Sequence, residues 1–125
     1  MTAGTLQRSL EFRELVSLVM QVNGINVQPK RPRNRGSKFG DLLAQPEQPA
    51  SDLVGLPDWT VSVRHQRERP ISKALNEVEK DAGFDGTSRA AVIWNRPEYE
   101  AEDSIVVMSL RTFMAVLKDE LGRQT

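Results

Sequence analysis

Apolar residues recur at helical spacing near the start of the chain, and this set comprises Leu6, Leu10, Leu15, Leu18, Val19 and Val22. The last four follow at i, i+3, i+4 and i+7, which predicts an amphipathic helix. Asn23-Gly24 is a typical stop signal for such a helix. The short Ile25-Asn26-Val27 that follows is compatible with a weak strand.

Three further segments have the composition of strands. Polar and apolar residues alternate from Trp59, which predicts a strand over residues 59–65. The apolar run at residues 90–94 and the segment 104–108, which is apolar after Ser104, instead predict strands that are covered on both faces.

Two more helices complete the pattern. Pro70 suits the first turn of a helix, and apolar residues follow it at helical spacing up to Gly83: Ile71, Ala74, Leu75, Val78 and Ala82. The last helix is expected to end at Gly122, with the apolar positions Leu110, Phe113, Met114, Leu117 and Leu121.

Polar segments separate these elements. Residues 28–51 form a Pro-rich, basic region that predicts irregular structure. Residues 95–103 form an acidic turn. The order of helices and strands favours an α/β domain spanning residues 1–125, in which helices flank a small mixed β-sheet.

Composition excludes several kinds of site. The chain has 125 residues with 17 basic and 17 acidic side chains, so net charge gives no reason to expect a nucleic-acid partner. It has no cysteine and one histidine, which excludes disulfides, a Cys nucleophile and a multi-His zinc site within one chain. No apolar run has the length of a membrane span or a signal peptide, so we expect a soluble cytoplasmic protein without a membrane partner.

The segment Asp52-Leu-Val-Gly-Leu-Pro-Asp-Trp59 carries a resemblance to a known family. This turn is similar to one in the restriction-endonuclease-like, or PD-(D/E)xK, superfamily, and more narrowly to Holliday-junction-resolvase-like proteins of actinobacterial phages. Leu10-Glu11 on the first helix, the Glu77 region of the middle helix, and residues 104–110 also match landmarks of that family. The resemblance covers roughly residues 6–121. It implies a restriction-endonuclease-like fold, and the cytoplasm of a bacterial host as the location.

Two of the family's catalytic positions differ in this chain. The resemblance implies that Asp52 and a strand carboxylate hold Mg²⁺ while a strand Lys assists the attacking water. Here those two strand positions are Ser62 and Arg64. A Ser hydroxyl in place of the carboxylate removes one negative charge, and an Arg side chain stays protonated near neutral pH, so it does not act as a base. We therefore expect a degenerate site in which Arg64 neutralises Asp52, and weak or no Mg²⁺ binding.

Two alternatives remain open at this site. A second carboxylate from a neighbouring element would restore metal binding, and the candidates are Glu11, Asp41, Glu47, Glu68 and Glu77. Glu11 and Glu77 lie on helices that should pack against the sheet, whereas the plainer interpretation makes all five solvated acids. Asp52 itself could be only a turn residue, because Asp is common in turns.

Basic residues near these positions are the candidate phosphate contacts. One cluster comprises Lys30, Arg31, Arg33, Arg35 and Lys38, and a second comprises Arg64, His65, Arg67, Arg69 and Lys73. If both lie on one face they form a local positive surface. The plainer interpretation is a pair of solvated loops and a structural histidine.

Three functions are compatible with these observations. The leading hypothesis is a resolvase-like protein that has lost catalysis and binds DNA or a protein partner. The first alternative is an active, Mg²⁺-dependent endonuclease with a relocated carboxylate. The second is a phage protein that modulates a host protein. A homodimer is compatible with each.

Overall fold

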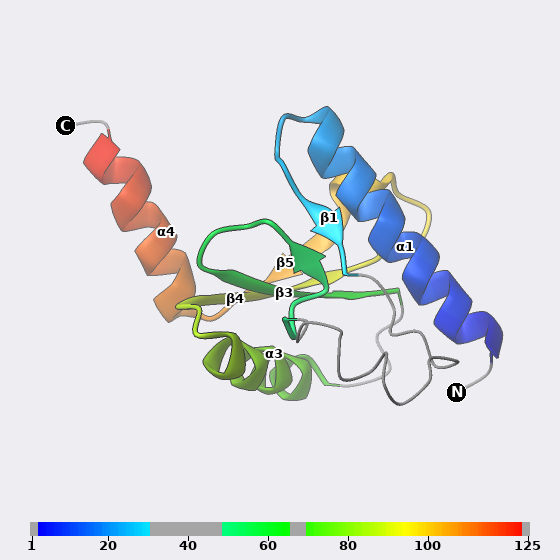
Figure 1. Cartoon of the computed structure of the whole chain (residues 1–125), viewed down its shortest axis with the longest axis horizontal. Helices are drawn as coiled ribbons and strands as arrows, with labels where there is room; N and C mark the ends of the chain where they lie inside the picture. Colours follow the sequence, from blue (N-terminus) through cyan, green and yellow to red (C-terminus); the bar gives the residue numbers. More distant parts are fainter. Residues whose placement is uncertain (1–2, 31–48, 66–69, 124–125) are drawn as a thin grey trace, which may run out of the picture.

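Three α-helices and two small β-sheets make up the described part of the chain in the computed structural model, which covers residues 3–30, 49–65 and 70–123 (Figure 1). The helices are α1 (Ala3–Val22), α3 (Ile71–Asp85) and α4 (Leu110–Arg123), with a short 3₁₀ turn, η1 (Ala101–Asp103). The strands are β1 (Gln28–Pro29), β2 (Leu53–Val54), β3 (Trp59–Arg64), β4 (Arg89–Trp94) and β5 (Ile105–Val107). The predicted mixed α/β class is confirmed.

The larger sheet has the order β3-β4-β5. Strands β3 and β4 are parallel, with α3 as the connection between them, and β5 runs antiparallel to β4. Strands β1 and β2 form a separate antiparallel pair, whose second strand leads directly into β3. Helices α1 and α3 lie on opposite sides of the β3–β4 sheet (Figure 1). This arrangement gives the sheet two covered faces.

Alternation along β3 assigns its residues to the two faces. Val61 and Val63 are buried in one cluster with Phe12 and Val16 of α1. Thr60 and Arg64, on either side of this pair, point the other way, since they bond to side chains of α3. On that second face, α3 packs its small residues against β4 in a cluster that comprises Ala74, Val78, Ala82, Ala90, Val92 and Trp94. One strand therefore carries both the core and the candidate site.

The Asp85 carboxylate fixes the loop that precedes β2. It accepts hydrogen bonds from the backbone N–H groups of Ala50 and Ser51 at 2.8 and 3.1 Å, and from Thr60 Oγ1 at 3.0 Å. The Ser51 hydroxyl continues the connection, because it accepts a bond from the Val61 N–H at 2.9 Å. Helix α3 thereby holds residue 52 beside β3.

The predicted strands are confirmed at β3, β4 and β5, but the weak strand expected at Ile25–Val27 and the double covering expected of β5 were wrong. Ile25–Val27 is not a strand, and the pairing lies at Gln28–Pro29 because the β1–β2 register joins Gln28 to Val54. The predicted strand at residues 104–108 forms as β5 over a shorter range, yet it is not covered on both faces. It is the outer strand of its sheet, and the Val106 side chain is 53% exposed.

The three helices lie where the sequence predicts them, but the predicted buried face of α1 and the predicted ends of α3 and α4 were wrong. α1 ends at Val22 as expected, but the face it buries contains Phe12 and Val16, while Leu15, Leu18 and Val22 are exposed. α3 continues past Gly83 to Asp85, and left-handed Gly86 caps it. α4 continues through Gly122 to Arg123. Of the irregular region 28–51, β1 is regular, and residues 31–48 lie outside the described part of the chain.

Gly55 permits the close approach of the β1 and β2 segments. A side chain added at this position therefore tests that approach. A Cβ atom at Gly55, where φ is +107°, would lie 2.9 Å from the backbone oxygen of Asn26. We expect Gly55→Ala to lower the free energy of unfolding by about 2–4 kcal/mol, because it adds a backbone clash to left-handed strain. Urea unfolding measures the change.

Gly24→Ala is the matched control, since Gly24 also has a positive φ, +86°, but nothing lies within 4 Å of its added Cβ. It should cost only the conformational part, about 1–2 kcal/mol. Equal losses for the two variants would contradict the close β1–β2 approach.

Candidate functional site

Asp52 is fixed on several sides by the backbone of its neighbours. Its N–H donates to the Val61 carbonyl at 2.7 Å, and its own carbonyl accepts from the Lys30 N–H at 2.8 Å. Its carboxylate oxygen Oδ2 accepts from the Val63 N–H at 2.8 Å. Residue 52 and the middle of β3, where Ser62 and Arg64 lie, are therefore in direct contact, as the sequence predicted.

Arg13 supplies the positive charge opposite Asp52. Its Nη2 atom lies 3.0 Å from Asp52 Oδ1, and the two side chains are only 16% and 15% exposed. The prediction that Arg64 would neutralise Asp52 was wrong. Arg13 follows the buried Phe12 on α1, and the sequence analysis missed it because it assigned the buried face of that helix to Leu15 and Leu18.

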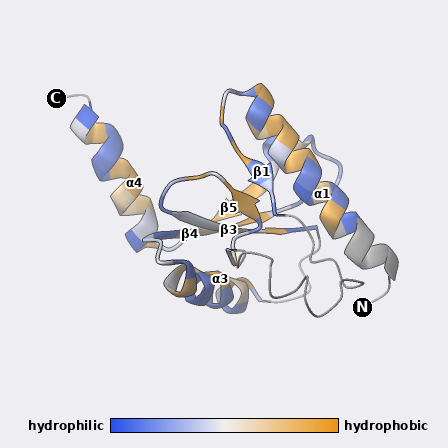
Figure 2. Ribbon diagram, in the orientation of Figure 1, coloured by the Kyte–Doolittle hydropathy of each residue, from blue (hydrophilic) through white to orange (hydrophobic). Residues whose placement is uncertain are grey.

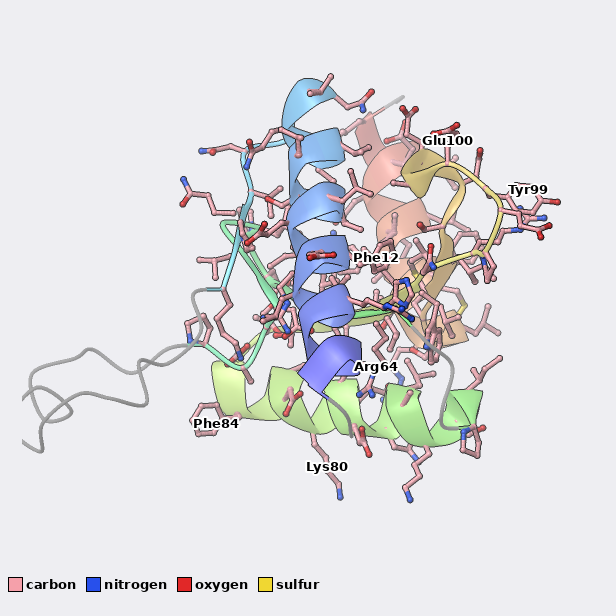
Figure 3. The ribbon with its side chains drawn as sticks, turned by 90° about the vertical axis from the view of Figure 1, so that its right-hand side faces the viewer. Phe12, Arg64, Lys80, Phe84, Tyr99 and Glu100 are labelled. Carbon is pink, nitrogen blue, oxygen red and sulfur yellow. The ribbon has the colours of Figure 1, made fainter. Side chains whose placement is uncertain are left out.

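Arg64 is directed to α3 instead (Figure 3). Its Nη2 donates to Glu77 Oε2 at 3.0 Å, and its Nε donates to Ser62 Oγ at 3.2 Å. The Arg64 and Glu77 side chains are 29% and 33% exposed, so this pair is more open to solvent than the Arg13–Asp52 pair. The site thus contains two separate ion pairs, each joining a helix to the β2–β3 region.

The carboxylates of this site do not suit a magnesium ion. Mg²⁺ requires hard anionic oxygens in a near-octahedral arrangement. Both Asp52 oxygens already accept an N–H group, and the Glu77 carboxylate already holds Arg64. Among the residues that the structure describes, no three Asp, Glu or His side chains gather closely enough to bind a metal ion.

The other candidate carboxylates do not complete such a set. Glu11 is exposed on α1 and has an interaction of its own. Asp41, Glu47 and Glu68 lie outside the described residues.

Asp81 is an acidic neighbour of this site that the sequence analysis did not single out. Burial raises the pKa of its carboxyl group, and the negative charges of Asp85 and Asp52 raise that pKa further. Lys30 acts in the opposite direction. Positions 77, 81 and 85 recur at i, i+4 and i+8 on α3, which is the spacing that would have indicated an acidic stripe facing Asp52.

Of the candidate phosphate contacts, the structure describes four. Lys30 lies beside the site, with its Nζ 3.5 Å from the Ala50 carbonyl. His65 is half-buried, its ring meets Phe12 edge-on at 6.0 Å, and its buried Nδ1 atom has no hydrogen-bond partner among the residues that the structure describes. Lys73 is exposed on α3. The fourth is Arg64, and the remaining candidates lie outside the described residues: Arg31, Arg33, Arg35, Lys38, Arg67 and Arg69.

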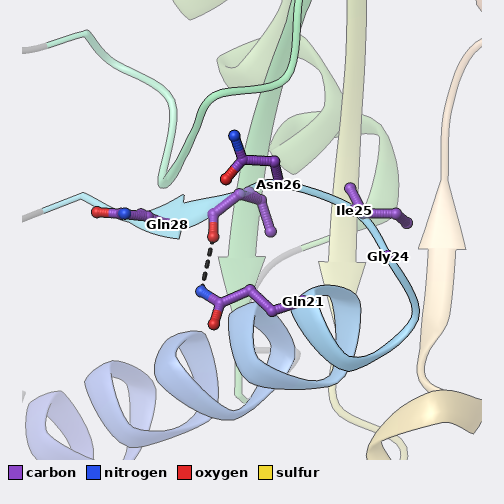
Figure 4. A pocket seen from close by; sticks show the side chains of 6 residues that line it. Gln21, Gly24, Ile25, Asn26 and Gln28 are labelled. Carbon is purple, nitrogen blue, oxygen red and sulfur yellow. Dashed lines mark hydrogen bonds between the residues drawn. The ribbon is translucent and has the colours of Figure 1, made fainter.

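A surface pocket of about 380 Å³ lies apart from these charges, at the end of α1 (Figure 4). Its lining residues are Gln21, Gly24, Ile25, Asn26, Val27 and Gln28. The Gln21 amide donates to the Val27 carbonyl at 2.7 Å and to Ser17 Oγ at 3.2 Å, so it ties α1 to β1. No ionisable side chain lines this pocket, and its polar groups hold the fold together.

In comparisons with known proteins, no family model, curated protein or solved structure matches the chain. Within the described residues, no helix combines the length and apolar character needed to cross a membrane.

Double-mutant cycles test the two ion pairs against each other. We expect a coupling energy of about 1–3 kcal/mol between Arg13→Ala and Asp52→Ala, because both groups are largely shielded from water. Solvent screens the Arg64–Glu77 pair more strongly, so its coupling should stay below about 1 kcal/mol. Chemical denaturation of the four single and two double variants gives both values. A larger coupling for Arg64–Glu77 would contradict the assignment of Arg13 to Asp52.

Proposed function

We propose that the chain is a restriction-endonuclease-like domain, related to phage Holliday-junction resolvases, that does not cleave nucleic acid and that binds DNA through the face around Arg64. The observation that carries the proposal is the pair of internal ion pairs, Arg13–Asp52 and Arg64–Glu77. In these two ion pairs, the acidic and basic side chains at the expected metal site are already bound to each other or to a neighbouring helix.

The chain order supports the fold part of this proposal. A helix comes first, followed by the β1–β2 pair, β3, a crossover helix and the parallel strand β4. Asp52 immediately precedes β2, and its carboxylate bonds to the backbone of Val63 between Ser62 and Arg64. This is the arrangement that an Asp, a turn and a carboxylate-x-Lys strand require in the family that the sequence resembles.

The chemistry of the site argues against hydrolysis. A metal ion in such a site lowers the pKa of the attacking water and stabilises charge on the phosphoryl group. Here a guanidinium occupies the position next to Asp52, and guanidinium has no open coordination position for water. Ser62 accepts a hydrogen bond from Arg64 and contributes no negative charge. The groups that remain can hold an anion, but they do not activate a nucleophile.

The placement of basic residues supports DNA as the partner. Residues 31–48 follow Lys30 in the sequence, and the Lys30 backbone bonds to Asp52; residues 66–69 follow His65, which comes directly after Arg64. These two segments carry Arg31, Arg33, Arg35, Lys38, Arg67 and Arg69. Arg64 is partly exposed and can exchange Glu77 for a phosphate, which guanidinium binds bidentately.

Binding and cleavage assays on a four-way DNA junction test both parts. We expect binding at low salt and no cleavage in Mg²⁺ or Mn²⁺. Arg33→Ala and Arg35→Ala should each reduce the slope of log K against log salt by about one, since each removes one phosphate contact. Arg111→Ala is the matched control: this arginine is exposed on α4 and should leave the slope unchanged.

The other results separate the alternative functions. Metal-dependent cleavage that Asp52→Asn abolishes would establish the active endonuclease and contradict the loss of catalysis. Failure to bind junction, duplex and single-stranded DNA at low salt would contradict DNA binding and leave the protein-binding module.

A further inference from the structure

Helix α4 exposes a continuous row of apolar side chains, which we call the α4 stripe. Its members are Leu110, Phe113, Met114, Leu117 and Leu121, with exposed fractions of 41–70%. The helix extends away from the end of the larger sheet, with the chain's C-terminal end pointing outward (Figure 2). Large apolar side chains gathered in this way mark an interaction surface more often than an ordinary exterior.

The opposite side of α4 faces the domain. Thr112 is the buried residue of this helix within the described part of the chain, and Asp119 pairs with Arg89 at the start of β4. At 3.6 residues per turn, Thr112, Val116 and Asp119 fall on one side of the helix and the α4 stripe falls on the other. The domain therefore holds α4 by its polar side and leaves the apolar side uncovered.

This arrangement distinguishes α4 from the other helices. α1 also exposes Leu15 and Leu18, but it buries Phe12 and Val16 in the core. α4 buries none of its large apolar residues. A helix of 14 residues has only marginal stability on its own, and most helices are stabilised by packing of the apolar face. The α4 stripe is thus the part of the described surface with the most to gain from a cover.

We propose that the α4 stripe packs against the α4 stripe of a second copy of this chain around a two-fold axis. Leu110, Met114, Leu117 and Leu121 are separated by four, three and four residues, which is the spacing of a helix-pairing seam. A two-fold interface joins identical surfaces, so a seam that suits helix pairing can pair with itself.

The area available is sufficient for such a pair. The stripe runs along a helix of about 21 Å, at 1.5 Å per residue. Five large side chains from each copy, each 41–70% exposed, bring the buried area to roughly 1,000 Å², the size at which specific interfaces begin. The pairing is therefore expected to be reversible, with a dissociation constant in the micromolar range.

Sedimentation of the full chain without DNA tests this proposal separately from DNA binding. We expect a concentration-dependent dimer over about two decades of micromolar concentration. Met114→Glu and Leu117→Glu should each weaken the association at least ~100-fold, because each places a charge in the seam. Phe84→Glu and Leu18→Glu are matched controls on α3 and α1, where the side chains are 72% and 56% exposed, and neither should change the mass.

A cross-linking experiment keeps the test decisive if the glutamate variants lose their helix. The chain has no cysteine, so Leu117→Cys introduces a single thiol into the stripe. Mild oxidation should link two copies of this variant, whereas Phe84→Cys should remain unlinked. A wild-type chain that stays monomeric, or a dimer that survives both stripe substitutions and dissociates with Leu18→Glu, would overturn the proposal.

Discussion

The Asp52 carboxylate and its two bonds hold together the part of the molecule on which the functional account depends. Oδ1 pairs with Arg13 of α1, and Oδ2 accepts the N–H of Val63 in β3. The backbone of the same residue joins Lys30 after β1 to Val61 in β3. Helix α1, strand β3 and the end of β1 therefore meet at one residue, and the helix on one side of the sheet supplies the charge that balances it. Removing that charge would leave a shielded carboxylate that still accepts the Val63 N–H but has lost its ion pair.

The same balance supports the proposal that this site does not catalyse hydrolysis. A carboxylate next to a second carboxylate attracts a cation, because repulsion between the two is relieved when a metal binds. At this site Asp52 and Glu77 each have a guanidinium nitrogen 3.0 Å away. The protein itself therefore neutralises the charge of these two carboxylates. Of the two guanidinium groups, that of Arg64 is the more open to solvent, with 29% of its side chain exposed against 16% for Arg13.

The sequence predicted the mixed α/β class and the position of the site, because both rest on local signals. The alternation at Trp59–Arg64 and the turn before it set Asp52 against β3, and the structure has them in contact. It did not predict which cation faces Asp52, since that depends on how α1 is rotated. Leu15 and Leu18 fit a helical stripe as well as Phe12 and Val16 do, and only packing against Val61 and Val63 decides between them. Glu77 was a candidate metal ligand in the sequence, whereas three-dimensional proximity makes it the partner of Arg64.

The exposure of the apolar face of α4 was likewise not predictable from local sequence signals. Its periodicity predicted an amphipathic helix correctly, but periodicity does not say whether the apolar side faces the domain or a partner.

Calorimetric titration of the wild-type chain with Mn²⁺ tests the central claim, that Arg13 takes the place of a metal ion beside Asp52. The account predicts no saturable binding by the wild type, and binding by a variant that combines Arg13→Ala, Ser62→Glu and Arg64→Lys, because this variant removes the internal cation and restores the second carboxylate. A micromolar Mn²⁺ site in the wild type that Asp52→Ala abolishes would contradict it.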